Sequence, residues 1–189
     1  MSRIVITGAP GAGKTTLLLA LQARGYTIVR DTARAIIQDR RRRGLSPRPD
    51  AYAFAQETLR IDIENFVHLG AGQELVFFER GVLDAMCGLD RLTPLSEIEL
   101  SVGLSKYRYF SKVFILPPWK AIYVSDAERD QTFDHAESVN RITLEWYRRC
   151  GYQIVEVPMV PVEERCTFIL QELSAVTPNH HSTRSAMDV

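Results

Sequence analysis

Short apolar runs rich in β-branched and aromatic residues alternate along the chain with longer stretches of mixed polarity. Such runs predict strands that are buried on both faces, as in parallel sheets. The longer stretches carry apolar residues at helical spacing, which is typical of helices that cover a sheet. The predicted strands are residues 3–7, 26–30, 74–78, 112–116 and 153–157.

Helix start and stop signals complete this alternation. Asp31 or Thr32 could cap the helix after the second strand, and Gly25 ends the first helix. We therefore expect an α/β fold in three layers, with a five-stranded parallel sheet and helices on both faces. Residues 1–176 would form one domain, and the polar residues 177–189 a disordered tail. The predicted helices are residues 14–24, 31–43, 51–69, 82–92, 96–107, 121–150 and 162–173.

A glycine-rich turn between the first strand and the first helix matches the phosphate-binding pattern G-x-x-x-x-G-K-[ST]. Glycines let backbone N–H groups surround phosphate oxygens, and the helix N-terminus adds a positive dipole end. Lys14 can reach the β- and γ-phosphates of a nucleoside triphosphate, and the Thr15 hydroxyl can bind Mg²⁺. The sequence thus predicts a site for ATP and Mg²⁺, built from Gly8, Ala9, Pro10, Gly11, Ala12, Gly13, Lys14, Thr15 and Thr16.

Charged residues follow the second and third strands, at the sheet edge where ligands of such folds bind. A carboxylate at Asp31 or Glu79 could accept a proton from an attacking hydroxyl or hold a metal ion, so both are catalytic candidates. Asp31 could equally cap its helix, and Glu79 could form a salt bridge. Arg34 and Arg80 are candidates for substrate or phosphate charge. Asp84 is a further substrate candidate, although it could simply favour the helix dipole.

Residues 120–131 are a candidate lid over the transferred phosphate. Arg129 would supply a mobile cation there, and closing would exclude water. The same stretch could instead be a solvated charged helix. Trp119 could stack on a base or a substrate ring, or it could cover the edge of the core.

Charge and cysteine content narrow the partners. The net charge is zero, which gives no general attraction to nucleic acid or to an anionic membrane. The dense basic run at residues 40–43 could contact either, but a solvated helix end explains it as well. No apolar stretch reaches the roughly 18 residues of a membrane span, so stable membrane association is not expected. Three scattered cysteines and the absence of a leader pattern predict a cytoplasmic protein.

Five motifs together carry a family resemblance: GAPGAGKTT, DTARAII, FFERG-x-x-D, PPW-x-A-I-Y and DAERDQTF. They resemble small predicted ATPases grouped as an AAA-type domain family, which are similar to the P-loop domain of nicotinamide riboside kinases and, more distantly, to nucleoside and nucleotide kinases. The resemblance implies a kinase-like sheet, a lid near Arg129 and an adenine-contacting loop at residues 157–162. It also places Asp31 at the position of a catalytic base. Sensor and arginine-finger patterns of hexameric AAA machines are missing, so no ring assembly is implied.

Three functions fit these observations. The first is a small-molecule kinase that transfers the γ-phosphoryl group of ATP to a hydroxyl of a nucleoside-like or other metabolite. The second is a nucleotide-dependent switch or ATPase acting on a protein or lipid partner, and the third is a polynucleotide 5′-end kinase. The sequence favours the first, with Lys14, Asp31, Glu79 and Arg129 in catalytic roles and Thr15 and Glu79 as metal ligands. It leaves the acceptor and the oligomeric state open.

Overall fold

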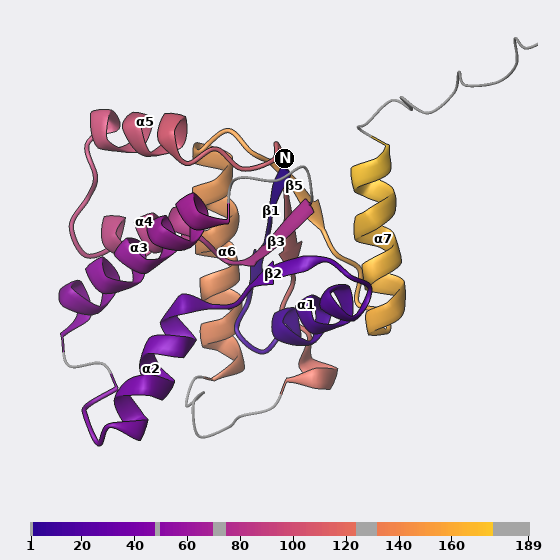
Figure 1. The fold of residues 1–189 in the computed structure, drawn as a ribbon, viewed down its shortest axis with the longest axis horizontal. Helices are drawn as coiled ribbons and strands as arrows, with labels where there is room; N and C mark the ends of the chain where they lie inside the picture. The colour runs from indigo at the N-terminus through magenta and orange to yellow at the C-terminus, as the bar shows by residue number, and fades with distance from the viewer. Residues whose placement is uncertain (1, 48–49, 70–74, 124–131, 176–189) are drawn as a thin grey trace, which may run out of the picture.

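Five parallel strands form one sheet in the order β2-β3-β1-β4-β5, with helices on both faces (Figure 1). This arrangement confirms the predicted α/β fold class. The computed structural model describes residues 2–47, 50–69, 75–123 and 132–175. The strands are β1 (Ser2–Gly8), β2 (Thr27–Val29), β3 (Leu75–Glu79), β4 (Lys112–Leu116) and β5 (Gln153–Glu156).

Side chains alternate between two cores because successive residues of a strand point to opposite faces. Val5 and Phe78 belong to one buried cluster, whereas Ile4 and Phe77 belong to the other. Every one of these four side chains is almost completely shielded from solvent. This two-sided burial explains why the strands read as continuous apolar runs.

Helices α1 (Lys14–Ala23) and α7 (Val162–Ser174) cover one face of the sheet, on the right in Figure 1. Leu17, Leu18 and Leu21 of α1 pack there with Cys166 and Ile169 of α7. The other face is covered by α3, α4 and α6. The remaining helices are α2 (Thr32–Arg42), α3 (Ala51–His68), α4 (Val82–Asp90), α5 (Glu97–Lys106), α6 (Phe133–Arg149) and a short 3₁₀ helix at Lys120–Ile122.

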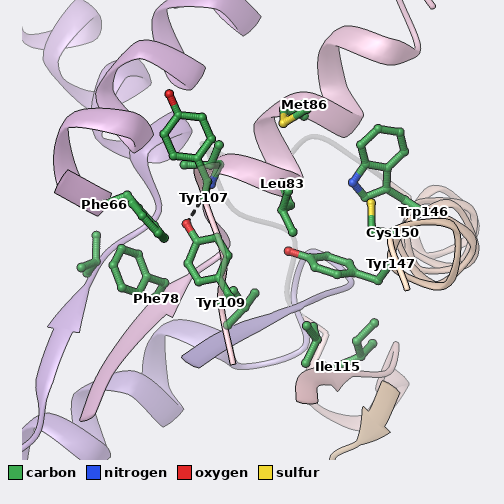
Figure 2. Close-up of a cluster of buried hydrophobic side chains, with 14 of the residues drawn as sticks. Phe66, Phe78, Leu83, Met86, Tyr107, Tyr109, Ile115, Trp146, Tyr147 and Cys150 are labelled. Carbon is green, nitrogen blue, oxygen red and sulfur yellow. Dashed lines mark hydrogen bonds between the residues drawn. The ribbon is translucent and has the colours of Figure 1, made fainter. Parts of the chain in front are cut away.

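The second face is rich in aromatic side chains that meet edge to face (Figure 2). The Phe66 ring lies 5.1 Å from that of Tyr109, and the Tyr109 ring lies 5.4 Å from that of Phe78. Buried polar tips need partners. The Tyr109 hydroxyl meets this need by accepting a hydrogen bond of 3.1 Å from the backbone N–H of Val82. This bond anchors the start of α4, which carries part of the site described below.

One predicted helix was misplaced, and the strand ends differ from their predicted residues by at most one position. The helix predicted at residues 121–150 is wrong at its start: residues 120–122 form a 3₁₀ turn, and α6 begins at Phe133. Its start is fixed by Thr132, whose hydroxyl accepts a hydrogen bond of 3.2 Å from the N–H of His135. Strand β3 extends to Glu79, one residue beyond its predicted end. No helix in the described part of the chain is long and apolar enough to span a bilayer.

Candidate active site

The loop between β1 and α1 has the backbone shape that its glycines permit. Gly11 and Gly13 have φ angles of +80° and +83°, in the left-handed region. Gly8 also has positive φ, and a Cβ there would lie 2.3 Å from the Leu116 carbonyl oxygen. Helix α1 begins at Lys14, so its N-terminal N–H groups face the concave side of the loop. The loop is thus shaped to hold an anionic group.

Lys14 is buried within this loop. Its ammonium group donates hydrogen bonds to the carbonyl oxygens of Ala9 (2.7 Å) and Gly8 (3.2 Å). Burial, assisted by the nearby positive charge of Arg80, lowers the pKa of Lys14 to about 7, while Glu79 acts in the opposite direction. A bound phosphate would supply the negative charge that favours the protonated form.

Thr15 and Glu79 meet at the mouth of the loop. The Thr15 hydroxyl donates to the Glu79 carboxylate, with distances of 2.8 Å to Oε1 and 3.1 Å to Oε2. Glu79 is 6% exposed and stands at the end of β3, next to β1. This all-oxygen pair beside a phosphate loop is the donor set that Mg²⁺ prefers. Both residues therefore fit the metal role predicted for them.

Arg80 lies at the centre of an ion-pair network. Its Nε is 3.4 Å from Asp31, its Nη1 is 3.4 Å from Asp84, and its Nη2 donates to the Gly8 carbonyl at 3.1 Å. Burial opposes the charge of Arg80, but Asp31 and Asp84 outweigh it and raise its pKa above the ordinary value. The cation is thereby fixed between the phosphate loop and the start of α2.

The backbone of Arg80 is strained. Its φ of +67° is the single positive value among the non-glycine residues that the structure describes. A left-handed conformation costs an ordinary residue about 1–2 kcal/mol. The strained backbone N–H is held by the carbonyl of Ile6 at 3.0 Å. Such strain is typical of residues held in place for a functional reason.

Asp31 combines the two roles considered for it. Its Oδ1 accepts a hydrogen bond of 3.1 Å from the Arg34 N–H, which caps α2, and its Oδ2 faces Arg80. Capping fixes the carboxylate at the end of β2, and the pairing with Arg80 aims it toward the phosphate loop. The cap and a catalytic role are therefore compatible.

Asp84 has both oxygens engaged within the protein. Oδ1 accepts from the Thr7 hydroxyl and faces Arg80, while Oδ2 accepts from the Tyr147 hydroxyl at 2.6 Å. Tyr147 is fully buried, and this burial, together with its contact with the Asp84 carboxylate, raises its pKa well above the usual value. These contacts favour Asp84 as a residue that positions Arg80, rather than one that contacts substrate.

A cavity of about 730 Å³ joins these groups. For reference we call the lining from the phosphate loop and its neighbours the donor half, and the lining from α2, α3, α4 and the strand ends beside them the acceptor half. The donor half is lined by Pro10, Gly11, Gly13, Lys14, Thr15, Thr16, Ile122 and Arg165. The acceptor half is lined by residues of α2, α3 and α4, including Asp31, Thr32, Arg34, Ile37, Phe54, Thr58, Asp62, Arg80, Asp84, Gly88 and Arg91.

Not every predicted site residue lies on this cavity. Trp119 stands behind its wall, with its ring 5.5 Å from the guanidinium carbon of Arg165. Arg129 falls outside the described residues. The basic run 40–43 closes α2 away from the cavity, where Arg42 and Arg43 pair with Asp39.

Asp62 and Arg165 also line the cavity, but the sequence analysis did not predict either of them as a site residue. Asp62 accepts a hydrogen bond from the Thr32 hydroxyl, which is also 3.4 Å from Asn65. Burial raises the pKa of Asp62 to about 7, as do Asp84 and Asp31, while the bond from Thr32 acts to lower it. A charged residue at a core-facing position of an amphipathic helix was the available signal in both cases.

Comparison with known proteins places the chain in a family. A family model described as an AAA domain matches residues 3–165. The chain therefore belongs to this AAA-domain family of P-loop proteins, as its motifs predicted. No curated protein matches the sequence.

Three solved structures that resemble this chain are two complexes of one kinase and one nucleotide complex. A deoxyadenosine kinase from M. mycoides with bound dATP has 16% sequence identity and a TM-score of 0.60, over 92% of this chain and all of that one. The same kinase with the products dCMP and dCDP has 15% identity and a TM-score of 0.64, over 92% and 100% of the two chains. The YorR protein from Bacillus subtilis, in complex with phosphorylated GDP, has 15% identity and a TM-score of 0.59, over 97% and 100%. These likenesses support a kinase-like fold.

Proposed function

We propose that this protein is a small-molecule kinase that transfers the γ-phosphoryl group of ATP to a hydroxyl of a nucleoside-like metabolite. The observation that carries the proposal is the continuity of the cavity: one cavity is lined both by the phosphate loop and by residues of α2, α3 and α4. Hydrolysis needs room for one water molecule, whereas this cavity is lined by three helices besides the loop. The kinase folds of the matching structures support the same conclusion.

In this proposal the phosphate loop and Lys14 bind the triphosphate, and Thr15 and Glu79 hold Mg²⁺. The metal would neutralise charge on the phosphate oxygens. Asp31 orients the acceptor hydroxyl and accepts its proton as the oxygen attacks phosphorus. The bond from the γ-phosphorus to the bridging oxygen breaks, a new phosphorus–oxygen bond forms, and ADP leaves.

Arg80 fits a charge-stabilising role between the two substrates. Its guanidinium stands between the phosphate loop and Asp31, where negative charge would grow on the transferred group. Asp84 and Tyr147 hold it from behind. Arg34 lines the acceptor half, where it would contact polar groups of the acceptor. Arg129 keeps its predicted place in a lid.

The test is ADP formation from ATP and Mg²⁺, with and without a panel of nucleosides and other hydroxylated metabolites. We expect one chemical class of acceptor to stimulate turnover and to appear phosphorylated by mass spectrometry. Asp31→Asn should reduce transfer to that acceptor by about 10²–10⁴-fold. ATP affinity should change little, because Asp31 is assigned to the acceptor.

Asn retains an oxygen that can accept the capping hydrogen bond, so the variant should stay folded. Slow ATP hydrolysis that ignores every acceptor would overturn the kinase assignment. It would favour a nucleotide-dependent switch or ATPase acting on a partner instead. Unchanged transfer in Asp31→Asn would remove Asp31 from the role of base while leaving the kinase assignment in place.

A further inference from the structure

Gly88 is a glycine at a place in the fold that does not require one. It lies in the last turn of α4, two residues before the helix ends at Asp90, and so not at the capping position where glycine is common. Its φ angle is not positive. A Cβ added to it would meet nothing within 4 Å. Neither the backbone conformation nor close packing therefore excludes a side chain at this position.

The other glycines in the described part of the chain each have one of these two reasons. A Cβ on Gly81 would overlap the Tyr109 hydroxyl, and a Cβ on Gly103 would overlap the Met86 side chain. Because glycine weakens a helix relative to alanine, Gly88 needs an explanation of another kind. The remaining six have φ angles in the left-handed region, namely Gly8, Gly11, Gly13, Gly25, Gly44 and Gly151.

The cavity supplies such an explanation. Three residues of α4 and the residue that follows it line the cavity, namely Asp84, Ala85, Gly88 and Arg91. They recur at helical spacing, so they share the face of α4 that is turned toward the cavity. The face turned toward the core carries large side chains instead, such as Leu83 and Met86. Between Asp84 and Arg91 the cavity face therefore has no side chain larger than a methyl group.

Gly88 also lies near the groups assigned to the acceptor. Asp84 precedes it by one helical turn, the spacing at which residues of a helix are neighbours. Asp84 faces Arg80 at 3.4 Å, and Arg80 faces Asp31, the proposed base, at the same distance. A molecule whose hydroxyl is held by Asp31 therefore has room to extend along α4 to Gly88.

Apolar side chains from other helices line the same cavity. Ile37 belongs to α2, Phe54 to α3 and Val139 to α6. Small-molecule sites are typically apolar around the body of a ligand, with a few polar groups that orient it. An acceptor that carries a ring beside its reactive hydroxyl matches both parts of this lining. Glycine lets such a ring approach the helix backbone more closely than any other residue would.

We infer that Gly88 determines which acceptors fit: a ring of the acceptor packs against the backbone of α4 at this residue, in space that any side chain would fill. The inference rests on the proposed function, because it needs an acceptor in the cavity. It makes Gly88 a specificity-determining position for acceptors with a bulky ring, such as nucleosides. It gives Gly88 no role toward ATP.

The test is steady-state phosphorylation of adenosine and cytidine by the wild type, Gly88→Ala and Gly88→Leu. The KM of each nucleoside is measured at saturating ATP, and the KM of ATP at a saturating nucleoside. We expect the nucleoside KM to rise about threefold in Gly88→Ala and about 10–100-fold in Gly88→Leu, the scale of overpacking a close contact. The KM of ATP should change less than about twofold, because Gly88 is not assigned to ATP.

Thermal stability separates a blocked site from a damaged fold. Gly88→Ala should raise the melting temperature by about 2–4 °C, because alanine favours a helix and its Cβ would meet no atom within 4 Å. Gly88→Ala also keeps the inference testable should Gly88→Leu fail to fold. Ser101→Leu is the control, since it adds the same side chain at an exposed position of α5 outside the cavity lining. It should leave both KM values unchanged.

The outcomes distinguish the two proposals. If the wild type phosphorylates neither nucleoside, the nucleoside-like acceptor of the proposed function fails, and the role of Gly88 fails with it. If the wild type phosphorylates a nucleoside and Gly88→Leu does so with an unchanged KM, the role of Gly88 alone is overturned. An equal rise of the nucleoside and ATP KM values in Gly88→Ala would also overturn it, because a general disturbance of the cavity would explain both.

Discussion

The two halves of the cavity are built in different ways. The donor half is largely one continuous stretch within residues 10–16, shaped by a glycine-rich backbone turn. The acceptor half gathers side chains from three successive helices, α2, α3 and α4, and from the ends of β2 and β3. A backbone site requires glycines at fixed spacing, whereas a side-chain site requires only that the fold bring its members together. The first kind therefore leaves a motif, and the second leaves scattered charges.

The two halves of the cavity also differ in how their buried charges are balanced. In the donor half a single lysine is buried beside carbonyl oxygens and would gain its counter-charge from the ligand. In the acceptor half Asp31 and Asp84 face Arg80 and balance it within the protein. Loss of the Lys14 charge should accordingly harm ligand binding, whereas loss of a charge from the Asp31–Arg80–Asp84 network should harm protein stability.

The largest expected effect is at Lys14. Lys14→Met should lower phosphoryl transfer by about 10³-fold or more, because a preorganised cation at the transferred phosphate is lost. The free energy of unfolding should stay equal or rise, since a buried cation is replaced by an apolar side chain of similar length. A coupled ADP assay and urea denaturation would measure both. A destabilised Lys14→Met would contradict the contrast between the halves.

Glu79→Gln tests the boundary between the halves. Its amide oxygen can still accept the hydrogen bond from Thr15, but the charge assigned to Mg²⁺ is lost. We expect the Mg²⁺ concentration for half-maximal activity to rise by about 10–100-fold, the typical loss of metal affinity when a metal site loses a supporting group. Titration of MgCl₂ at fixed ATP measures it. An unchanged Mg²⁺ dependence would remove Glu79 from the metal site.

Asp62→Asn should act on stability. Because folding raises the pKa of Asp62 from 3.8 to about 7, the native state binds more protons than the unfolded state between these values. The contribution of Asp62 to stability is therefore lost as pH rises through this window. Asn retains an acceptor for Thr32, so it should stabilise the protein by about 1–3 kcal/mol above pH 7.

The difference in unfolding free energy between Asp62→Asn and the wild type should level off below about pH 3, where Asp62 is mostly protonated in both the folded and the unfolded state. Urea denaturation at several pH values measures this difference. A value independent of pH would show that the Asp62 carboxylate is not strained by burial.

The smallest effect is a proton taken up on nucleotide binding. Free Lys14, with a pKa of about 7, is mostly neutral at pH 8.5, and a bound triphosphate should restore its charge. Calorimetry in buffers of different ionisation enthalpy should show uptake of nearly one proton at pH 8.5 and little at pH 5.5. Lys14→Met is the control and should remove the uptake at pH 8.5.

The sequence predicted those features that depend on residues close together in the chain. The strands, the phosphate loop and the cap at Asp31 follow from periodicity, glycine spacing and capping chemistry, and the structure has all three. Arg165 could not be placed in this way, because its contact with Ala12 joins residues 153 positions apart. The start of α6 was missed because charged residues after Tyr123 have good helix propensity, and only the cap at Thr132 marks the boundary.

The strained backbone of Arg80 sets stability against activity at a single position. A glycine would adopt the +67° angle without strain, yet it could not reach Asp31, Asp84 or the phosphate loop. Selection for a stable fold and selection for a functional site therefore favour different residues here. An arginine at this position therefore exchanges stability for a fixed charge between the phosphate loop, Asp31 and Asp84.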